Sequence, residues 1–288
     1  LGAGNDTLKF VTAAVKAGST FNLGAGDDTL EIALAANAVE IDFGAGSNTI
    51  KATHATAADL TAATLKGNVS TIDLSIGNLK VTNEQFADFG SSISLKGSAA
   101  KVLTVDASAA TTAQTIDLST ISATNTTNST VAVTGSANGD TIIGSVVADA
   151  ITLGAAGKKD IVDVSKSVSL AMDSISVFKT NEDKLKFGGD AGTATNFTAI
   201  DINSGIAAFD ASVAITKAQT SVFNTSTAGK SNYAFIIDST NNGTKTIGYL
   251  VVDIDGDKSA DHVVELTGLT GGSATAATTD FNYADIIA

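Results

Sequence analysis

Hydrophobic and polar residues alternate over many short stretches of this chain. Leu8 and Phe10, and again Leu30 and Ile32, are separated by single charged residues. A period of two places successive side chains on opposite faces, so each stretch is typical of a half-buried β-strand. The sequence therefore predicts an all-β protein built from many short strands.

A seven-residue motif recurs three times between these stretches. It reads Gly-Ala-Gly-Asn-Asp-Thr-Leu at 2–8, Gly-Ala-Gly-Asp-Asp-Thr-Leu at 24–30 and Gly-Ala-Gly-Ser-Asn-Thr-Ile at 44–50, in steps of 22 and 20 residues. A regular step of this size indicates a repeating architecture. The glycines permit tight turns, and the following Asp supplies the oxygen ligands that Ca²⁺ prefers. The motif thus predicts a calcium-binding turn between two strands of a parallel β-helix.

These copies resemble the glycine- and aspartate-rich nonapeptide repeats of RTX proteins. The resemblance implies a parallel β-roll in which several Ca²⁺ ions lie between stacked turns, held by loop carbonyls and Asp carboxylates. The matching positions are Gly2, Gly4, Asp6, Gly24, Gly26, Asp28, Gly44, Gly46 and, in the third copy, Asn48. Because Asn offers one neutral oxygen where the family has Asp, we expect weaker binding between the second and third turns.

Four stretches follow from these patterns. We expect calcium β-roll turns over 1–51, a metal-poor β-helical section with short helices over 52–134, a second RTX-like β-roll over 135–187, and a C-terminal β-rich cap with a secretion signal over 188–288.

The metal-poor section keeps the strand signal without the glycine loops. Alternating stretches recur at 70–74, 102–106 and 115–118. Two short helices are expected over 56–65 and 83–89, the second beginning at Asn83 as its N-cap.

The third stretch restarts the glycine-then-aspartate pattern. Asp140, Asp149 and Asp160 follow glycine-containing loops in steps of 9 and 11 residues. A nine-residue step alternates between two edges, so we expect Asp140 and Asp160 on one edge and Asp149 on the other. The sequence predicts calcium between the loops 135–140 and 154–160, with Asp149 a further candidate ligand.

The last stretch holds another acidic loop. Its carboxylates, at Asp253, Asp255, Asp257 and Asp261, occupy positions 1, 3, 5 and 9 of the loop, which places them on one side of a turn. The loop resembles short Asp-rich calcium loops, except that Lys258 stands where such loops carry Gly. A solvated hairpin turn is the alternative, since Asp and Gly favour turns.

Composition narrows the function classes. The formal net charge is −13 and all 17 basic residues are Lys. This charge disfavours binding to nucleic acid and favours binding of Ca²⁺. The alternative is that the acidity only keeps the protein soluble. The absence of Cys excludes disulfides, zinc-thiolate sites and thiol catalysis. No apolar run is long enough for a membrane span. Because the chain begins inside a repeat, we expect it to be the C-terminal piece of a longer protein.

Catalysis finds no support in these residues. His54 and His262 are isolated and belong to no zinc motif, and no nucleophile elbow is present. We therefore expect no enzymatic activity.

The favoured function is structural. Acidic, cysteine-free chains with degenerate RTX repeats resemble Gram-negative surface-layer proteins, in which the C-terminal part forms a calcium-dependent two-dimensional lattice and the N-terminal part anchors to lipopolysaccharide. The terminal Asp280–Ala288 is similar to the uncleaved signal of type I secretion substrates, which implies a secreted, cell-surface location. The alternatives are the secretion and folding module of an RTX protease or lipase, and an RTX adhesin.

Overall fold

The computed structural model describes most of the chain in two compact units. The described residues are 1–10, 15–33, 38–54, 58–97, 101–125, 130–154, 157–167, 171–202, 209–238, 247–269 and 281–288. The first unit comprises 1–109, 116–134 and 145–147, and the second comprises 110–115, 135–144 and 148–288. The four stretches predicted from the sequence are finer than these units, and their boundaries stay a prediction.

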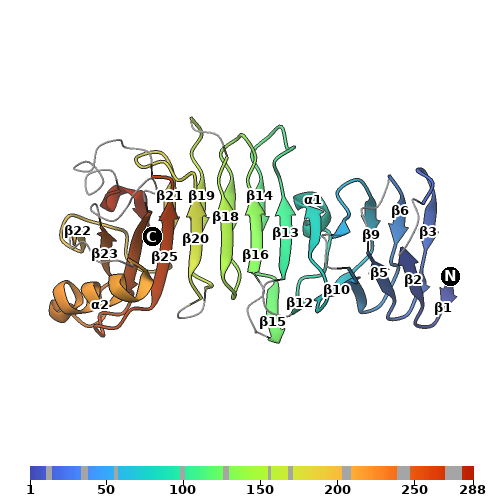
Figure 1. Cartoon of the computed structure of the whole chain (residues 1–288), viewed down its shortest axis with the longest axis horizontal. Helices are drawn as coiled ribbons and strands as arrows, with labels where there is room; N and C mark the ends of the chain where they lie inside the picture. Colours follow the sequence, from blue (N-terminus) through green and yellow to red (C-terminus); the bar gives the residue numbers. More distant parts are fainter. Residues whose placement is uncertain are drawn as a thin grey trace. The chain divides into compact units, whose positions relative to one another are not determined.

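The first unit is built from many short parallel strands (Figure 1). One sheet has the order β15-β12-β10-β7-β5-β2, a second has β3-β6-β9, a third pairs β1 with β4, and a fourth run has the order β16-β13-β11-β8. The strands are β1 (Gly2–Ala3), β2 (Thr7–Phe10), β3 (Thr20–Asn22), β4 (Gly24–Ala25), β5 (Thr29–Ile32), β6 (Glu40–Asp42), β7 (Asn48–Ala52), β8 (Ala58–Asp59), β9 (Thr64–Lys66), β10 (Val69–Leu74), β11 (Leu79–Thr82), β12 (Ile93–Gly97), β13 (Val102–Asp106), β15 (Ile121–Asn125) and β16 (Thr130–Thr134).

The register of these strands follows the sequence repeat. Leu30 lies opposite Ile50, and Ile50 lies opposite Ile72, at separations close to the spacing of the glycine motif. All three side chains are fully buried. Each apolar residue of the alternating pattern therefore stacks on its counterpart one repeat later, which explains why pattern and repeat coincide. The strands expected near 70–74, 102–106 and 115–118 are confirmed as β10, β13 and β14 (Thr115–Asp117).

The two helices expected in this unit have different outcomes. Helix α1 (Asn83–Ala87) is present, but Thr82 rather than Asn83 is its N-cap, in a capping box with Gln85. The helix expected over 56–65 is wrong for the described residues 58–65, which contain β8 and the start of β9 instead. Ala58 and Leu60 are buried at a spacing of two, so packing of a strand prevailed over local helix propensity.

The second unit combines parallel strand pairs with a run of three antiparallel strands. One region has the order β17-β19-β21-β26, and the other has β22-β23-β24-β25-β20-β18, in which β23-β24 and β24-β25 are antiparallel pairs. The elements are β17 (Thr141–Ile143), β18 (Asp149–Thr152), β19 (Ile161–Asp163), β20 (Asp173–Ser176), β21 (Lys184–Lys186), β22 (Phe197–Asp201), α2 (Ala211–Ser221), η1 (Phe223–Thr225), β23 (Asn232–Ile237), β24 (Ile247–Asp253), β25 (His262–Thr267), η2 (Tyr283–Asp285) and β26 (Ile286–Ile287).

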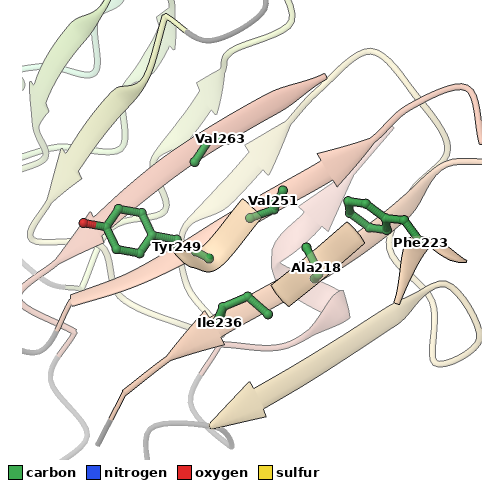
Figure 2. Packing of buried hydrophobic residues seen from close by; sticks show 8 residues of the cluster. Ala218, Phe223, Ile236, Tyr249, Val251 and Val263 are labelled. Carbon is green, nitrogen blue, oxygen red and sulfur yellow. The ribbon is translucent and has the colours of Figure 1, made fainter. Parts of the chain in front are cut away.

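Helix α2 was not expected in a β-rich cap. Asp210 caps it by accepting hydrogen bonds from two backbone N–H groups of the first turn. Ala214 and Ala218, four residues apart, are fully buried. Their small side chains let the helix pack closely on the sheet, against Ile236 and Val251 (Figure 2). An Asp followed by alanines at helical spacing was the signal in the sequence.

The protein is thus mostly β, with many short parallel strands and few helices. Among the described residues, no helix is both long and apolar enough to cross a membrane.

Candidate metal centre

The three glycine motifs stack directly on one another in the first unit. Gly2 lies opposite Gly24 in the β1–β4 pair, and Ala25 bridges to Ala45 in the third copy. Gly24 has a φ of +107°, and a Cβ placed on it would lie 1.8 Å from the Gly2 carbonyl oxygen. Glycine is therefore required twice over, for its backbone conformation and for the close approach of the turns.

The acidic and amide side chains after these glycines form a ladder. The Asp6 N–H donates to Asp28 Oδ1 at 2.8 Å, and the Asp28 N–H donates to Asn48 Oδ1 at 2.8 Å. A parallel ladder beside it links Asn5 to Asp27 by a backbone N–H. In the first ladder a backbone donor of each turn is thus satisfied by a side-chain oxygen of the next turn, whereas in the ladder beside it the oxygen belongs to the preceding turn.

The second oxygen of Asp28 sets this residue apart. Asp28 is fully buried, yet its Oδ2 has no hydrogen-bond partner among the described residues. In the next turn the corresponding atom is Asn48 Nδ2, which donates to the Asn68 carbonyl at 2.8 Å. The amide of Asn48 fits because its Nδ2 faces a carbonyl acceptor. The equivalent atom of Asp28 is a carboxylate oxygen, and no donor among the described residues reaches it. A buried carboxylate oxygen without a partner carries a large desolvation cost.

A second ladder, in the second unit, is built from the Asp residues predicted there. The Asp140 N–H donates to Asp160 Oδ1 at 2.7 Å, and the Asp160 N–H donates to Asp183 Oδ1 at 2.9 Å. Asp149 stacks instead on Asp173, whose Oδ1 accepts its N–H at 2.9 Å. The expectation that Asp140 and Asp160 share one edge while Asp149 occupies another is therefore confirmed.

The protein itself supplies donors to both oxygens of several carboxylates in this second ladder. Asp140 Oδ1 accepts from the Gln114 N–H and the Ser136 hydroxyl, and Asp140 Oδ2 accepts from the Ser136 N–H. Asp183 likewise accepts from the Lys179 N–H through Oδ2. A cation between the loops 135–140 and 154–160 would have to compete with these hydrogen bonds, and calcium at Asp140, Asp149 and Asp160 stays a prediction.

Burial leaves some of these carboxyls hard to ionise. It raises the pKa of Asp160 to about 6, and the nearby carboxylates of Asp183 and Asp140 act in the same direction. Burial also raises the pKa of Asp173 to about 6, against the hydrogen bond from the Ser167 hydroxyl. Protonation of Asp160 and Asp173 therefore stabilises the folded ladder.

The acidic loop between β24 and β25 brings three of its four candidate ligands together. Carboxylate oxygens of Asp253, Asp255 and Asp261 lie within 4.8 Å of one another, and this group does not include Asp257. Asp253 is fully buried, with its two oxygens accepting the N–H groups of Gly256 and Lys258. The strand, turn and strand expected here are confirmed.

Lys258 departs from the glycine that such loops carry, and the structure shows the consequence. Its φ is +79°, a left-handed conformation that L-residues adopt at a cost. The loop is therefore strained at the position where the sequence departs from the calcium-loop pattern.

Sequence reasoning missed several of the residues that form these side-chain-to-backbone hydrogen bonds between turns. These are Asn5, Asp27, Asn68, Asp173, Asp183 and Asp285. Most lie outside any glycine motif. The available signal was local: Asp173, Asp183 and Asp285 each stand just before or at the start of a short strand with an inward aliphatic residue.

Comparisons with known proteins add no relative. No family model matches the chain, and no curated protein matches it.

Proposed function

We propose that this chain is a structural cell-surface protein that assembles into a calcium-dependent surface-layer lattice. On this proposal the parallel strands are coils of a β-roll, and Ca²⁺ ions bind at its glycine turns. The protein is secreted by the type I machinery, and a part outside this sequence anchors to lipopolysaccharide. No enzymatic activity is proposed.

One observation supports the calcium component above the others. Asp28 is a fully buried carboxylate, one oxygen of which has no hydrogen-bond partner among the described residues, and it follows a glycine turn that stacks closely on the backbone carbonyls of the preceding turn. Carboxylate and carbonyl oxygens are the ligands of Ca²⁺ in proteins. Asp28, Asp6 and the carbonyls of the glycine turns would hold the ion, and its charge would offset the cost of burying Asp28.

The acidic loop is the second candidate calcium site. Asp253, Asp255 and Asp261 place their oxygens close enough to share one ion. Ca²⁺ bound there would relieve the repulsion between three neighbouring carboxylates and hold the β24–β25 turn together.

The mechanism of assembly is thermodynamic linkage. At low calcium the mutually repulsive Asp turns are unstable. Because Ca²⁺ binds the folded form and not the unfolded one, its binding shifts the equilibrium toward folding. A rigid chain then presents fixed surfaces to its neighbours in the lattice.

The alternative is a calcium-binding secretion and folding module of an RTX protease or lipase, or an RTX adhesin. The metal-poor stretch 52–134, in which glycine motifs are absent, favours the surface layer over a protease or lipase module.

Calcium titration of the chain tests the proposal, with circular dichroism for folding and light scattering for assembly. A calcium-driven gain in β-signal with growth of large ordered assemblies is expected. Folding to a persistent monomer would move the function to the secretion-module alternative. If neither calcium nor a chelator changes either signal, the calcium assignments are wrong.

A further inference from the structure

The last eight residues of the chain are integrated into the body of the second unit. Strand β26 pairs in parallel with β21, Leu185 lying opposite Ile286, and the Gly192 N–H donates to the Ile286 carbonyl. Residues about one hundred positions apart in the sequence therefore complete one sheet.

An aromatic side chain anchors the start of this segment. Phe281 is fully buried, and its ring centroid lies 4.9 Å from that of Phe235, 5.7 Å from Phe178 and 6.0 Å from Phe197. These partners come from β22, β23 and the turn after β20. A single side chain of the C-terminal segment thus fills the space between three elements of the unit.

A buried ion pair anchors its middle. Asp285 is fully buried, and its Oδ1 accepts from the Asn181 N–H at 2.8 Å and from Lys184 Nζ at 3.1 Å. Its Oδ2 accepts the Asn282 N–H at 3.2 Å, which closes the capping box of η2. Lys184 is itself largely buried, so removal of either partner leaves an uncompensated charge in the interior.

The segment also packs closely against Gly192, where a larger residue would not fit. A Cβ on Gly192 would lie 2.4 Å from the Tyr283 carbonyl oxygen and 3.0 Å from the Ile286 Cβ. Tyr283, by contrast, is 43% exposed and makes none of these anchoring contacts through its ring. Anchoring is therefore concentrated in Phe281, Asp285 and the β26 backbone.

We propose that residues 281–288 form a C-terminal strap whose docking closes the second unit, so that strands β21 to β25 keep their native packing only while the strap is docked. When the segment is docked, Phe281, the Asp285 carboxylate and the β26 backbone are all in contact with the rest of the unit. A receptor that binds the segment as an extended peptide cannot reach them. Use of the segment as an export signal would then belong to the undocked chain, a consequence that rests on the function proposed above, whereas the docking does not.

Amide hydrogen exchange of the full chain in calcium buffer tests the strap. Phe281→Ala and Asp285→Ala are compared with the matched control Tyr283→Ala in the same segment. We expect protection of β21 and β23 to fall about a hundredfold in the first two variants, because a buried aromatic and a buried ion-pair partner each contribute several kcal/mol to local closure. We expect Tyr283→Ala to change it by less than about threefold, and β5 and β7 to stay unchanged in all three.

A chain ending at residue 280, supplied with a synthetic peptide of residues 281–288, provides the second arm. All three tyrosines lie in the second unit, so the near-ultraviolet circular dichroism of Tyr233 and Tyr249 reports on this unit alone. We expect the signal to be lost in the shortened chain and to return with the peptide.

Several outcomes would overturn the strap. They are unchanged protection of β21 and β23 in Phe281→Ala and Asp285→Ala, an equal loss in Tyr283→Ala, or a shortened chain that keeps the full tyrosine signal without the peptide. None of these readouts depends on lattice assembly, so failure of the strap and failure of the proposed function are distinguishable.

Discussion

The glycine turns of the first unit and the aspartate ladder of the second have similar sequences, but their buried carboxylates differ in hydrogen bonding. In both, a buried carboxylate or amide oxygen accepts the backbone N–H of the preceding turn. At Asp28 the other oxygen has no hydrogen-bond partner in the described part of the chain, whereas at Asp140 the other oxygen accepts the Ser136 N–H.

The difference lies in what replaces the glycines. Four residues before Asp28 the turn has Gly24, which offers no side-chain donor. The turn at Asp140 contains Ser136, whose hydroxyl and N–H both reach the carboxylate. One turn therefore leaves an oxygen without a donor and the other satisfies it internally, so the calcium dependence proposed above should be concentrated in the first.

The largest expected effect comes from adding a side chain to a glycine of the stacked turns. Gly24→Ala should destabilise the first unit by more than about 3 kcal/mol, because the new Cβ would overlap the Gly2 carbonyl and the residue would keep a positive φ. The control is Gly18→Ala, where φ is also positive but nothing lies within 4 Å of the added Cβ, and it should cost only about 1 kcal/mol. Equal losses in urea unfolding of the two variants would show that close stacking is unimportant.

The comparison is tested most directly by Asp28→Asn. The amide can donate as Asn48 does, so the calcium-free protein should become more stable by about 1–3 kcal/mol. The gain in stability on adding calcium should shrink by a similar amount. Thermal unfolding with and without calcium measures both.

Asp27→Asn is the matched control for this substitution. Asp27 is the exposed neighbour, and its Oδ1 accepts the Ser47 N–H. Its replacement should leave the calcium response nearly unchanged. A calcium response in Asp28→Asn equal to that of the unmodified chain would remove Asp28 from the site.

The stability of the aspartate ladder should depend on pH, whereas that of the glycine turns is expected to depend on calcium. The folded pKa of Asp160 and of Asp173 is about 6, above the unfolded value near 3.8. The folded state therefore binds more protons between pH 4 and 6, and these groups make the second unit more stable as pH falls through 6.

The expected size of this pH effect is about 1–2 kcal/mol for each group in calcium-free buffer. Near-ultraviolet tyrosine signals during denaturant unfolding at pH 7.5 and pH 5 measure it. Asp160→Asn, which stays neutral, should remove about half of the gain on acidification. A second unit that loses stability steadily from pH 7.5 to pH 5 in both proteins would contradict this assignment.

The smallest effect is expected in the acidic loop. Lys258→Gly should stabilise the second unit by about 0.5–1 kcal/mol, because glycine adopts the observed φ of +79° without strain. Since Lys258 contributes only its N–H to Asp253, the hydrogen bond is kept. Thermal unfolding followed through the tyrosine signal would detect the shift, and a lower midpoint would show that the lysine side chain is needed.

The sequence by itself determined the strand content and the stacking of the first unit. Alternation identified the strands, and the motif spacing set which of them pair, because equal steps bring equivalent residues such as Leu30 and Ile50 into register. The stacking of Asp140 on Asp160, with Asp149 on another edge, was also predictable from spacing alone.

Only the tertiary structure decided what each acidic residue contacts. Asp28 and Asp140 are preceded by similar glycine loops, but whether the second oxygen meets a donor depends on a neighbouring turn or on a serine four residues away. The docking of residues 281–288 on β21 was likewise beyond local pattern. Hydrophobic periodicity is a property of neighbours in sequence, whereas hydrogen-bond satisfaction of a buried charge depends on groups that folding brings from elsewhere in the chain.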